Sequence, residues 1–245
     1  MIHAMTDELF RDDATLLACQ ARITAVSDAG IELDRTVFYP QGGGQAGDTG
    51  RLRTADGSTL TITDTRKGGV PGQILHCVAP GTDLSAWAAG SAVTAEIDAD
   101  RRQAHRRFHT ATHLLCALVP HPVDGCSITA GYARLDFHMT EPLDKDTLSA
   151  GIAGLVAAAH PVLARWISDA DLDANPRLVR SMSVQPPRGQ GRVRLIDIAG
   201  VDLQPCGGTH VANTAEIGAV VVTKIEKKSA RTRRVVLGFA TPGLL

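Results

Sequence analysis

The chain has 245 residues, of which 44% are hydrophobic and 21% charged, so it is long enough for one large or two small domains with hydrophobic cores. No apolar run approaches the ~18 residues of a membrane helix, and Met1 to Arg11 are polar and acidic, unlike a signal peptide. Five scattered cysteines form no disulfide framework. We therefore expect a reduced, cytoplasmic protein without membrane association.

The net charge of −1 conceals an uneven distribution along the chain. Residues 1–99 hold 13 acidic and 7 basic side chains, a balance of −6, whereas residues 100–245 hold 13 acidic and 18 basic side chains, a balance of +5. The second region has two basic clusters: Arg101, Arg102, Arg106 and Arg107, then Lys224, Lys227, Lys228, Arg231, Arg233 and Arg234. Any one cluster is more often a solvated face, but two in the same region favour a polyanionic partner.

The first hundred residues have the pattern of short β-strands joined by tight turns. Turn residues at Ser27–Gly30 and Ala55–Ser58 separate the apolar and β-branched runs. The predicted strands are 21–26, 31–37, 51–53, 60–64 and 93–97, and a short helix is predicted at 83–89. This pattern predicts a small barrel-like domain or an open sheet.

A glycine-rich segment interrupts these strands. Phe38 to Gly50 read Phe-Tyr-Pro-Gln-Gly-Gly-Gly-Gln-Ala-Gly-Asp-Thr-Gly. Three consecutive glycines permit close approaches of the backbone that other residues deny. No lysine follows them, so the segment is not a phosphate loop of the Gly-Lys-Ser/Thr type. Taken alone, it predicts a wide loop or a bulge between strands.

Helical periodicity begins near Asp98–Asp100 and ends at Val119, before two prolines. The apolar stripe comprises Phe108, Ala111, Leu115 and Leu118. Because positions i and i+4 share one face of a helix, the Cβ atoms of His109 and His113 should be only ~6 Å apart. Alone, such a pair is as typical of half-buried core histidines as of a metal site.

The rest of the chain alternates between strand and helix patterns. The predicted strands are 134–139, 161–167, 192–198, 217–225 and 233–239, the last two forming a hairpin around a lysine-rich turn, and the predicted helix is 146–159. We therefore predict an α+β protein, with a small β-barrel-like domain over residues 1–98 and a mixed α/β zinc-binding domain over residues 99–245.

A second pair of potential metal ligands, Cys206 and His210, surrounds two glycines, so a tight loop can bring both side chains to one point. On its own, such a loop indicates a metal only weakly. Together with His109 and His113, it supplies three imidazoles and one thiolate, a set that zinc accepts readily. We therefore predict one Zn²⁺ site formed by His109, His113, Cys206 and His210.

The motifs Phe-Tyr-Pro-Gln-Gly-Gly-Gly-Gln, His-Thr-Ala-Thr-His-Leu-Leu and Cys-Gly-Gly-Thr-His-Val, with Arg-Arg near the end, occur in this order between residues 38 and 234. They resemble the editing region of alanyl-tRNA synthetase and, more closely, the free-standing alanyl-tRNA editing proteins of the AlaX family. The chain has no room for an aminoacylation domain and ends soon after the last hairpin. It therefore resembles the medium-length form of that family.

The resemblance implies trans-editing, which is hydrolysis of the ester that joins a wrongly attached serine or glycine to tRNA(Ala). The family's four zinc ligands carry over onto the four residues named above. Its glycine-rich loop, thought to lie near the editing pocket, carries over onto Gly42, Gly43, Gly44 and Gln45, with Asp48 close behind. The expected partner is the acceptor end of tRNA(Ala), and no obligate protein partner is evident.

One stretch departs from the family pattern. Many synthetase editing domains have Gln-Lys-Gly-Ser after the metal helix, where this chain has Val123-Asp124-Gly125-Cys126. The contacts that such a Gln and Ser can make to the amino acid are therefore in question here.

Hydrolysis of an aminoacyl ester needs a positioned water and a stabilised oxyanion, and zinc can supply either function. The hydroxyl groups of Thr110, Thr112 and Thr209 are the predicted catalytic groups, although the first two can instead bond back to their own helix. The N–H groups of Gly207 and Gly208 can form an oxyanion hole. Because four protein ligands usually close a zinc site, the zinc either becomes five-coordinate, or has one loose ligand, or positions the substrate amino group. Of these, we favour a zinc that orients the substrate.

The predicted phosphate contacts are Arg106, Arg107, Lys227, Lys228, Arg231 and Arg233. Two other functions stay open. Threonyl-tRNA synthetase editing domains look similar around the His and Cys-His motifs, so a different aminoacyl-tRNA is one alternative. A non-catalytic, zinc-stabilised RNA-binding module is the other. The sequence does not separate serine from glycine as the preferred amino acid.

Overall fold

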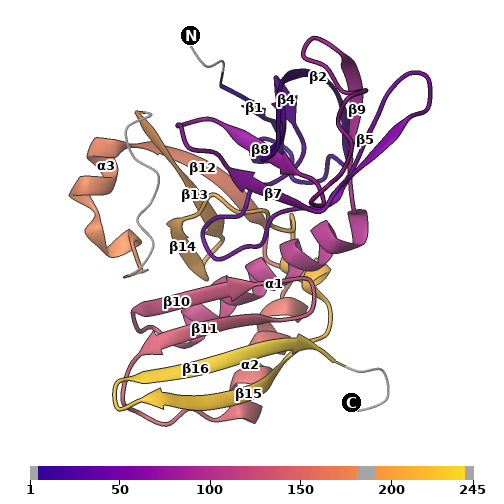
Figure 1. Ribbon diagram of the computed structural model, residues 1–245. Coiled ribbons are helices and arrows are strands. Elements are labelled where there is room, and N and C mark those ends of the chain that lie inside the picture. The colour runs from indigo at the N-terminus through magenta and orange to yellow at the C-terminus, as the bar shows by residue number, and fades with distance from the viewer. Residues whose placement is uncertain (1–4, 181, 183–190, 241–245) are drawn as a thin grey trace. The chain divides into compact units, whose positions relative to one another are not determined.

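The structure is a computed structural model that describes residues 5–180, 182 and 191–240 (Figure 1). The chain divides into two compact units. The first unit runs to Gly42 and resumes at Ala46–Gln103, and the second comprises Gly43–Gln45 and the chain from Ala104 onward. This division falls inside one helix, and the domain boundary predicted at residue 98 stays a prediction.

The first unit contains an antiparallel sheet with the strand order β6-β5-β9-β2-β3-β8-β7. Its elements are β1 (Asp7–Glu8), η1 (Leu9–Arg11), β2 (Ala18–Ser27), β3 (Gly30–Leu33), β4 (Arg35–Thr36), β5 (Gly50–Arg53), β6 (Thr59–Ile62), β7 (Asp64–Lys67), β8 (Ile74–Cys77) and β9 (Ala92–Ile97). Because β6 and β7 end the order without pairing to each other, the described part of the sheet is open, and the closed form of the barrel-like prediction is wrong.

Strand alternation builds the core of this unit. In β9, Val93, Ala95 and Ile97 are buried while the residues between them are more exposed, which is the period-two pattern of a half-buried strand. The helix predicted at 83–89 is wrong. There Asp83 Oδ1 accepts a hydrogen bond from Ser85 N at 2.9 Å, and this local bond holds a turn in place of helical bonds.

The second unit contains a four-stranded antiparallel sheet, β10-β11-β16-β15, and a three-stranded antiparallel sheet, β12-β13-β14. Its elements are α1 (Ala99–Leu118), β10 (Val123–Ile128), β11 (Ala133–His138), α2 (Lys145–Ala157), β12 (Val162–Ser168), α3 (Asp169–Ala174), η2 (Pro176–Leu178), β13 (Arg192–Ile198), β14 (Asp202–Pro205), η3 (Thr214–Ile217), β15 (Val220–Ser229) and β16 (Thr232–Phe239). The predicted α+β class is confirmed.

The two long helices pack on one face of the four-stranded sheet (Figure 1). From β11, Leu135 and Phe137 point into that core, where they meet Phe108 and Leu115 of α1 and Ile152 of α2. The outward positions of β11 are polar, as the alternation of a half-buried strand requires. Within the described part of the chain, none of the helices combines the length and the apolar character that crossing a membrane requires.

Helix α1 begins where the sequence indicates. Asp98 Oδ1 accepts from Arg101 N at 3.0 Å, as an N-terminal capping carboxylate does, and the Asp98 carbonyl oxygen accepts from Arg102 N. The helix ends at Leu118, before Pro120, which cannot continue it. This long, buried helix is the rigid element that carries two of the predicted metal ligands.

Candidate metal centre

Helix α1 and the loop after β14 bring four potential metal ligands together. His109, His113, Cys206 and His210 each offer a ligand atom, and these atoms all lie within 4.8 Å of one another. The Cys206 Sγ atom is 3.4 Å from His109 Nε2 and 3.2 Å from His210 Nε2. The two pairs predicted from their spacing therefore form one cluster.

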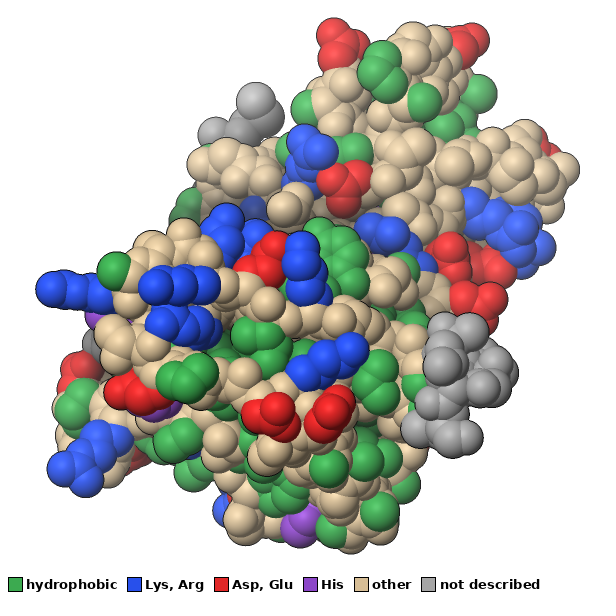
Figure 2. All heavy atoms as spheres, turned by 90° about the horizontal axis from the view of Figure 1, so that it is seen from below, with side chains coloured by type: hydrophobic (Ala, Val, Ile, Leu, Met, Phe, Trp, Pro, Cys, Tyr) green, Lys and Arg blue, Asp and Glu red, His purple; other side chains and the backbone are tan. Residues whose placement is uncertain are grey.

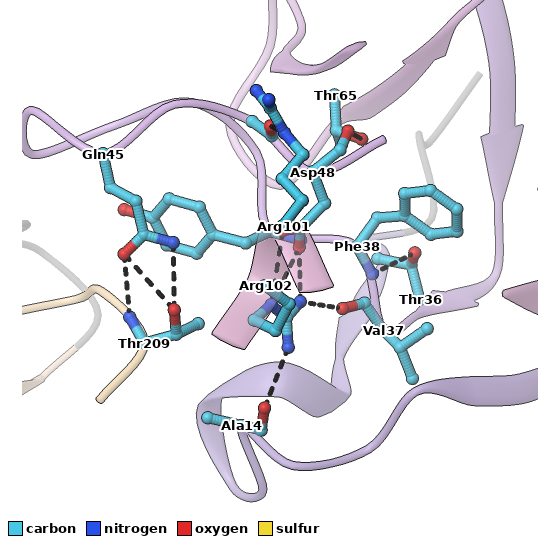
Figure 3. A network of polar contacts seen from close by, with 12 residues as sticks. Ala14, Thr36, Val37, Phe38, Gln45, Asp48, Thr65, Arg101, Arg102 and Thr209 are labelled. Atoms are coloured by element: carbon cyan, nitrogen blue, oxygen red, sulfur yellow. Dashed lines mark hydrogen bonds and ion pairs between the residues drawn. The ribbon is translucent and has the colours of Figure 1, made fainter. Parts of the chain in front are cut away.

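A buried glutamine orients His109. The Nδ1 atom of His109 is 2.8 Å from Gln45 Oε1, which also accepts from Thr209 N at 3.1 Å. Because a backbone N–H only donates, the Thr209 contact fixes the orientation of the amide, whose nitrogen donates to the Thr209 hydroxyl at 3.0 Å (Figure 3). Because an amide oxygen only accepts, Nδ1 of His109 carries the proton and Nε2 has a free lone pair toward the cluster.

A carboxylate orients His113. Its Nδ1 atom is 2.8 Å from Asp202 Oδ2, and Gln204 donates to the same carboxylate at 2.7 Å. Burial lowers the pKa of His113, but Asp202 and the Cys206 thiolate outweigh it and raise that pKa to about 9. The sequence analysis did not find Asp202 and Gln204, although they alternate along β14 with Cys206, which follows the strand directly and continues its pairing with β13.

The hydroxyl of Thr110 orients His210. It donates to the Arg106 carbonyl oxygen at 2.9 Å and accepts from Val211 N at 3.2 Å. With its single proton so used, its contact with His210 Nδ1 at 3.1 Å must be a hydrogen bond from the imidazole. All three imidazoles therefore carry a proton on Nδ1 and direct Nε2 toward the cluster.

Cys206 completes the set as a thiolate. Burial raises the pKa of this thiol, but the neighbouring imidazoles of His109 and His210 bring it well below its ordinary value. The Gly208 N–H also donates to the sulfur at 3.4 Å. The Gly208 N–H thus has a partner in this structure, and its place in an oxyanion hole stays a prediction.

The four side chains fit a zinc ion. Zn–N bonds of about 2.0–2.1 Å and Zn–S bonds of about 2.3 Å put tetrahedral ligand atoms roughly 3.3–3.6 Å apart. The measured separations of Cys206 Sγ from two Nε2 atoms, 3.4 and 3.2 Å, lie at this spacing. Each imidazole also has the hydrogen-bonded Nδ1 that is typical of metal-bound histidine.

The glycine motif supplies the support for His109. Gly43 and Gly44 have φ angles of 57° and 87°, in the region that favours glycine, and Gly44 O accepts from Ile128 N at 2.8 Å. A Cβ atom on Gly44 would lie 2.7 Å from Cys126 Sγ. The close approach places Gln45 next to His109, a role that the sequence analysis did not find.

Comparison with family models gives two matches. Residues 193–236 match the threonyl and alanyl tRNA synthetase second additional domain, and residues 9–101 match the class II (A) tRNA synthetases. The first match contains Cys206 and His210 of the cluster.

Curated relatives match over nearly the whole chain. The alanyl-tRNA editing protein AlaX-M of Methanosarcina barkeri is 33% identical over 240 residues, which cover 94% of this chain and 98% of the relative. AlaX-M of Saccharolobus solfataricus is 32% identical over 243 residues, with the same coverage. The chain belongs to the AlaX-M family of alanyl-tRNA editing proteins. The resemblance inferred from the motifs is thus confirmed.

The same region occurs within a larger enzyme. The alanine–tRNA ligase of Methanothermobacter thermautotrophicus is 32% identical over 247 residues, which cover 94% of this chain but only 26% of the ligase. This chain is therefore similar to one segment of that ligase.

The remaining residues of the glycine motif lie in the first unit. Asp48 is buried, accepts from Tyr39 N at 2.7 Å, and forms an ion pair with the buried guanidinium of Arg102 (Figure 3). Gly42 O accepts from the Tyr39 hydroxyl at 2.7 Å. These contacts give Asp48 a structural role, and the substrate contact predicted for it stays untested.

The three predicted catalytic threonines are all buried beside the cluster. Thr110 and Thr209 contact His210 and Gln45 as described, and Thr112 bonds back to the His109 carbonyl oxygen at 2.7 Å. Back-bonding, the alternative raised for Thr110 and Thr112, is therefore present in both. These contacts position metal ligands, and direct contact with a substrate stays a prediction.

Three predicted phosphate contacts, Arg106, Arg107 and Arg233, have structural partners, and Arg233 donates to the carbonyl oxygens of Ser229 and Thr140. The Arg106 Nε donates to the His210 carbonyl oxygen at 2.8 Å from a buried side chain. Arg107 donates to the Ile217 carbonyl oxygen at 2.7 Å, and its guanidinium carbon lies 4.1 Å from the Phe239 ring centroid. Arg106 thus holds the ligand loop.

The lysine-rich turn is shorter than predicted. Ser229 pairs with Thr232, so only Ala230 and Arg231 form the turn, while Lys227 and Lys228 belong to β15 and Arg233 to β16. On the face drawn in Figure 2, Lys and Arg side chains stand in several groups with Asp and Glu between them. Apart from Arg231, the predicted phosphate contacts of this hairpin therefore lie on paired strands, which fixes their spacing.

Proposed function

We propose that this chain is a trans-editing hydrolase that deacylates tRNA(Ala) carrying serine or glycine. Membership of the AlaX-M family supports the substrate class, since the relatives are named alanyl-tRNA editing proteins. The single observation that carries the chemistry is the buried cluster of three histidines and one cysteine, each imidazole held by a separate hydrogen bond.

We infer that His109, His113, Cys206 and His210 hold one zinc ion. When bound, zinc supplies a Lewis acid that orients the aminoacyl group and its ester. The chain itself supplies the preorganisation: Gln45, Asp202 and Thr110 keep the three Nδ1 protons in place, so no ligand reorients as substrate binds.

The three threonines are assigned positioning roles in this proposal. Thr110 holds His210, Thr209 holds Gln45, and Thr112 caps the His109 carbonyl within the helix. Gly207 and Gly208 are the candidate oxyanion donors of the ligand loop. Water attacks the ester carbonyl and the bond to the ribose oxygen breaks. The ribose oxygen takes up the proton that the water loses, so the products are free amino acid and tRNA(Ala).

The acceptor end of tRNA(Ala) is the proposed partner, with phosphate contacts by Arg107, Lys227, Lys228, Arg231 and Arg233. Lys227 and Lys228 are neighbours on β15, and Arg233 of β16 pairs with Lys227, so the three charges have a defined spacing. For the domains, we propose a β-rich domain over residues 1–98 and an editing domain over residues 99–245, to which the glycine motif contributes Gln45.

The decisive assay follows release of amino acid from Ser-, Gly- and Ala-tRNA(Ala), with Thr-tRNA(Thr) as a fourth substrate because the matched family model covers both synthetases. We expect Ser- or Gly-tRNA(Ala) to be hydrolysed well before Ala-tRNA(Ala). Preferential hydrolysis of Thr-tRNA(Thr) would show that the chain acts on the alternative substrate. If saturating, zinc-loaded protein leaves every substrate intact, the chain is instead a non-catalytic RNA-binding module.

A further inference from the structure

The three-stranded sheet has one face that carries the support of the metal centre. Directly opposed residues of antiparallel strands project to the same side. Trp166 opposes Arg194, and Ile198, four residues further along β13 and thus on the same face, opposes Asp202. Trp166 therefore stands on the face that carries Asp202, the carboxylate partner of His113.

The same face continues to Cys206. The Cys206 N–H donates to the Arg194 carbonyl oxygen at 3.0 Å, which extends the pairing of β13 and β14 by one residue. Trp166 and Cys206 therefore flank Arg194 on its two sides. Two strand spacings of about 4.8 Å put them on the order of 10 Å apart. This distance is comparable to the size of one nucleotide.

Trp166 is an exposed aromatic residue of β12, with an arginine at one end of its ring and, among the described residues of its strand, a small side chain toward the other. Its side chain is 39% exposed, and the Arg192 guanidinium carbon lies 4.3 Å from the indole centroid. Arg192 opposes Ser168, so it approaches the ring from that end of β12. At the other end, the next residue on the same face is Ala164, which is exposed and presents only a methyl group.

We propose that Trp166 is the stacking platform for the unpaired base at the 3′ end of the tRNA. This inference rests on the proposed function, because the ester to be cleaved lies on that terminal nucleotide. Bases stack on aromatic side chains regardless of sequence, and an arginine beside the ring adds a cation–π contact and a charge for the phosphate. A base on Trp166 directs its ribose toward the metal cluster across β13.

The kinetic test compares Trp166→Ala with Trp166→Phe. Loss of one stacked base should lower kcat/KM for Ser-tRNA(Ala) by about 5- to 150-fold, mainly through KM, at unchanged zinc content. The Phe variant should stay within a few-fold of the parent. Leu163→Ala is the matched control, since Leu163 is 49% exposed on the opposite face of β12. An unchanged KM in Trp166→Ala, or an equal loss in Leu163→Ala, would overturn the proposal.

A binding test is independent of catalysis. Trp87 and Trp166 are the two tryptophans of the chain, and Trp87 is buried in the core of the first unit. In a Trp87→Phe background, the trinucleotide CCA should quench the remaining indole fluorescence, and AMP should do so more weakly. Quenching without deacylation of any substrate would refute the proposed function but support base stacking on Trp166. Deacylation without quenching would support the proposed function but refute base stacking on Trp166.

Discussion

At the scale of single residues, the metal centre depends on side chains that do not touch the metal. Three different acceptors hold the Nδ1 atoms of the three histidines, and they come from the glycine motif, from β14 and from α1 itself. Outer partners of this kind fix the tautomer of a ligand and its orientation. The cluster is therefore shaped before any ion enters it.

Asp202→Asn should weaken zinc binding by about 10- to 100-fold, because the amide keeps the shape of the side chain but loses the charge that holds His113 Nδ1–H. A competition titration against a chelator measures this affinity. Asp197→Asn is the control: Asp197 lies on the neighbouring strand and pairs with the exposed Arg165. Equal zinc affinity in Asp202→Asn and the parent protein would contradict the assigned role of the carboxylate.

A second residue-scale prediction concerns pH. Burial lowers the pKa of His76, in the first unit, from 6.5 to about 4, and the neutral ring contacts Ile31 O at 2.9 Å and the Thr36 hydroxyl at 2.8 Å. The unfolded chain therefore binds the proton more tightly, so stability is retained above pH 6.5 and is lost as the pH falls toward 4. The loss is at most roughly 3 kcal/mol.

Urea unfolding at pH 7 and pH 5, followed by Trp87 fluorescence in a Trp166→Phe background, measures this effect. His76→Gln should lower stability at pH 7 but flatten the decline between the two pH values. A decline of the same size in both proteins would show that His76 does not control acid sensitivity.

At the scale of elements, the close approach of a loop to a helix creates the site. A Cβ atom on Gly208 would overlap the imidazole of His109, so only glycine fits between the ligand loop and α1. Gly43 and Gly44 likewise adopt positive φ angles to bring Gln45 to the same histidine. Glycine is therefore required at both contacts.

Gly208→Ala should remove zinc from the protein, because either His109 or the loop must shift to admit the methyl group. Elemental analysis should give well below one zinc per chain. Gly154→Ala is the matched control, since a Cβ atom there meets nothing within 4 Å and alanine favours the helix α2. Near-stoichiometric zinc in Gly208→Ala would show that the loop adapts.

The sequence was informative where one local pattern decides the structure. Helical periodicity and two prolines predicted α1 to within about a residue, and the spacing of two ligand pairs, together with the ligands that zinc accepts, predicted the four-residue cluster. The sequence predicted the structure poorly where the outcome depends on tertiary contacts. Gln45 and Asp202 act on residues far away in the chain, and Asp83 favours a turn over a weak helical pattern.

At the scale of the whole molecule, the charge asymmetry predicts how tRNA binds. Each phosphate that a basic residue neutralises should lower log affinity by about 0.7–0.9 per unit of log salt. Replacing Lys227, Lys228 and Arg233 by glutamine should weaken binding and flatten this slope at unchanged zinc content. Lys145→Gln, exposed at the start of α2, is the control. An unchanged affinity and slope would make the hairpin a merely solvated surface.

The most direct test of the account is the rate of serine release from Ser-tRNA(Ala), measured for the zinc-loaded protein and for Cys206→Ala side by side. We predict that the parent protein hydrolyses Ser-tRNA(Ala) faster than Ala-tRNA(Ala), and that Cys206→Ala loses both zinc and this activity while Cys116→Ala, whose thiol is buried in the core, loses neither. Undiminished serine release by Cys206→Ala, or none by the zinc-loaded parent, would contradict the claim that this cluster is an editing site.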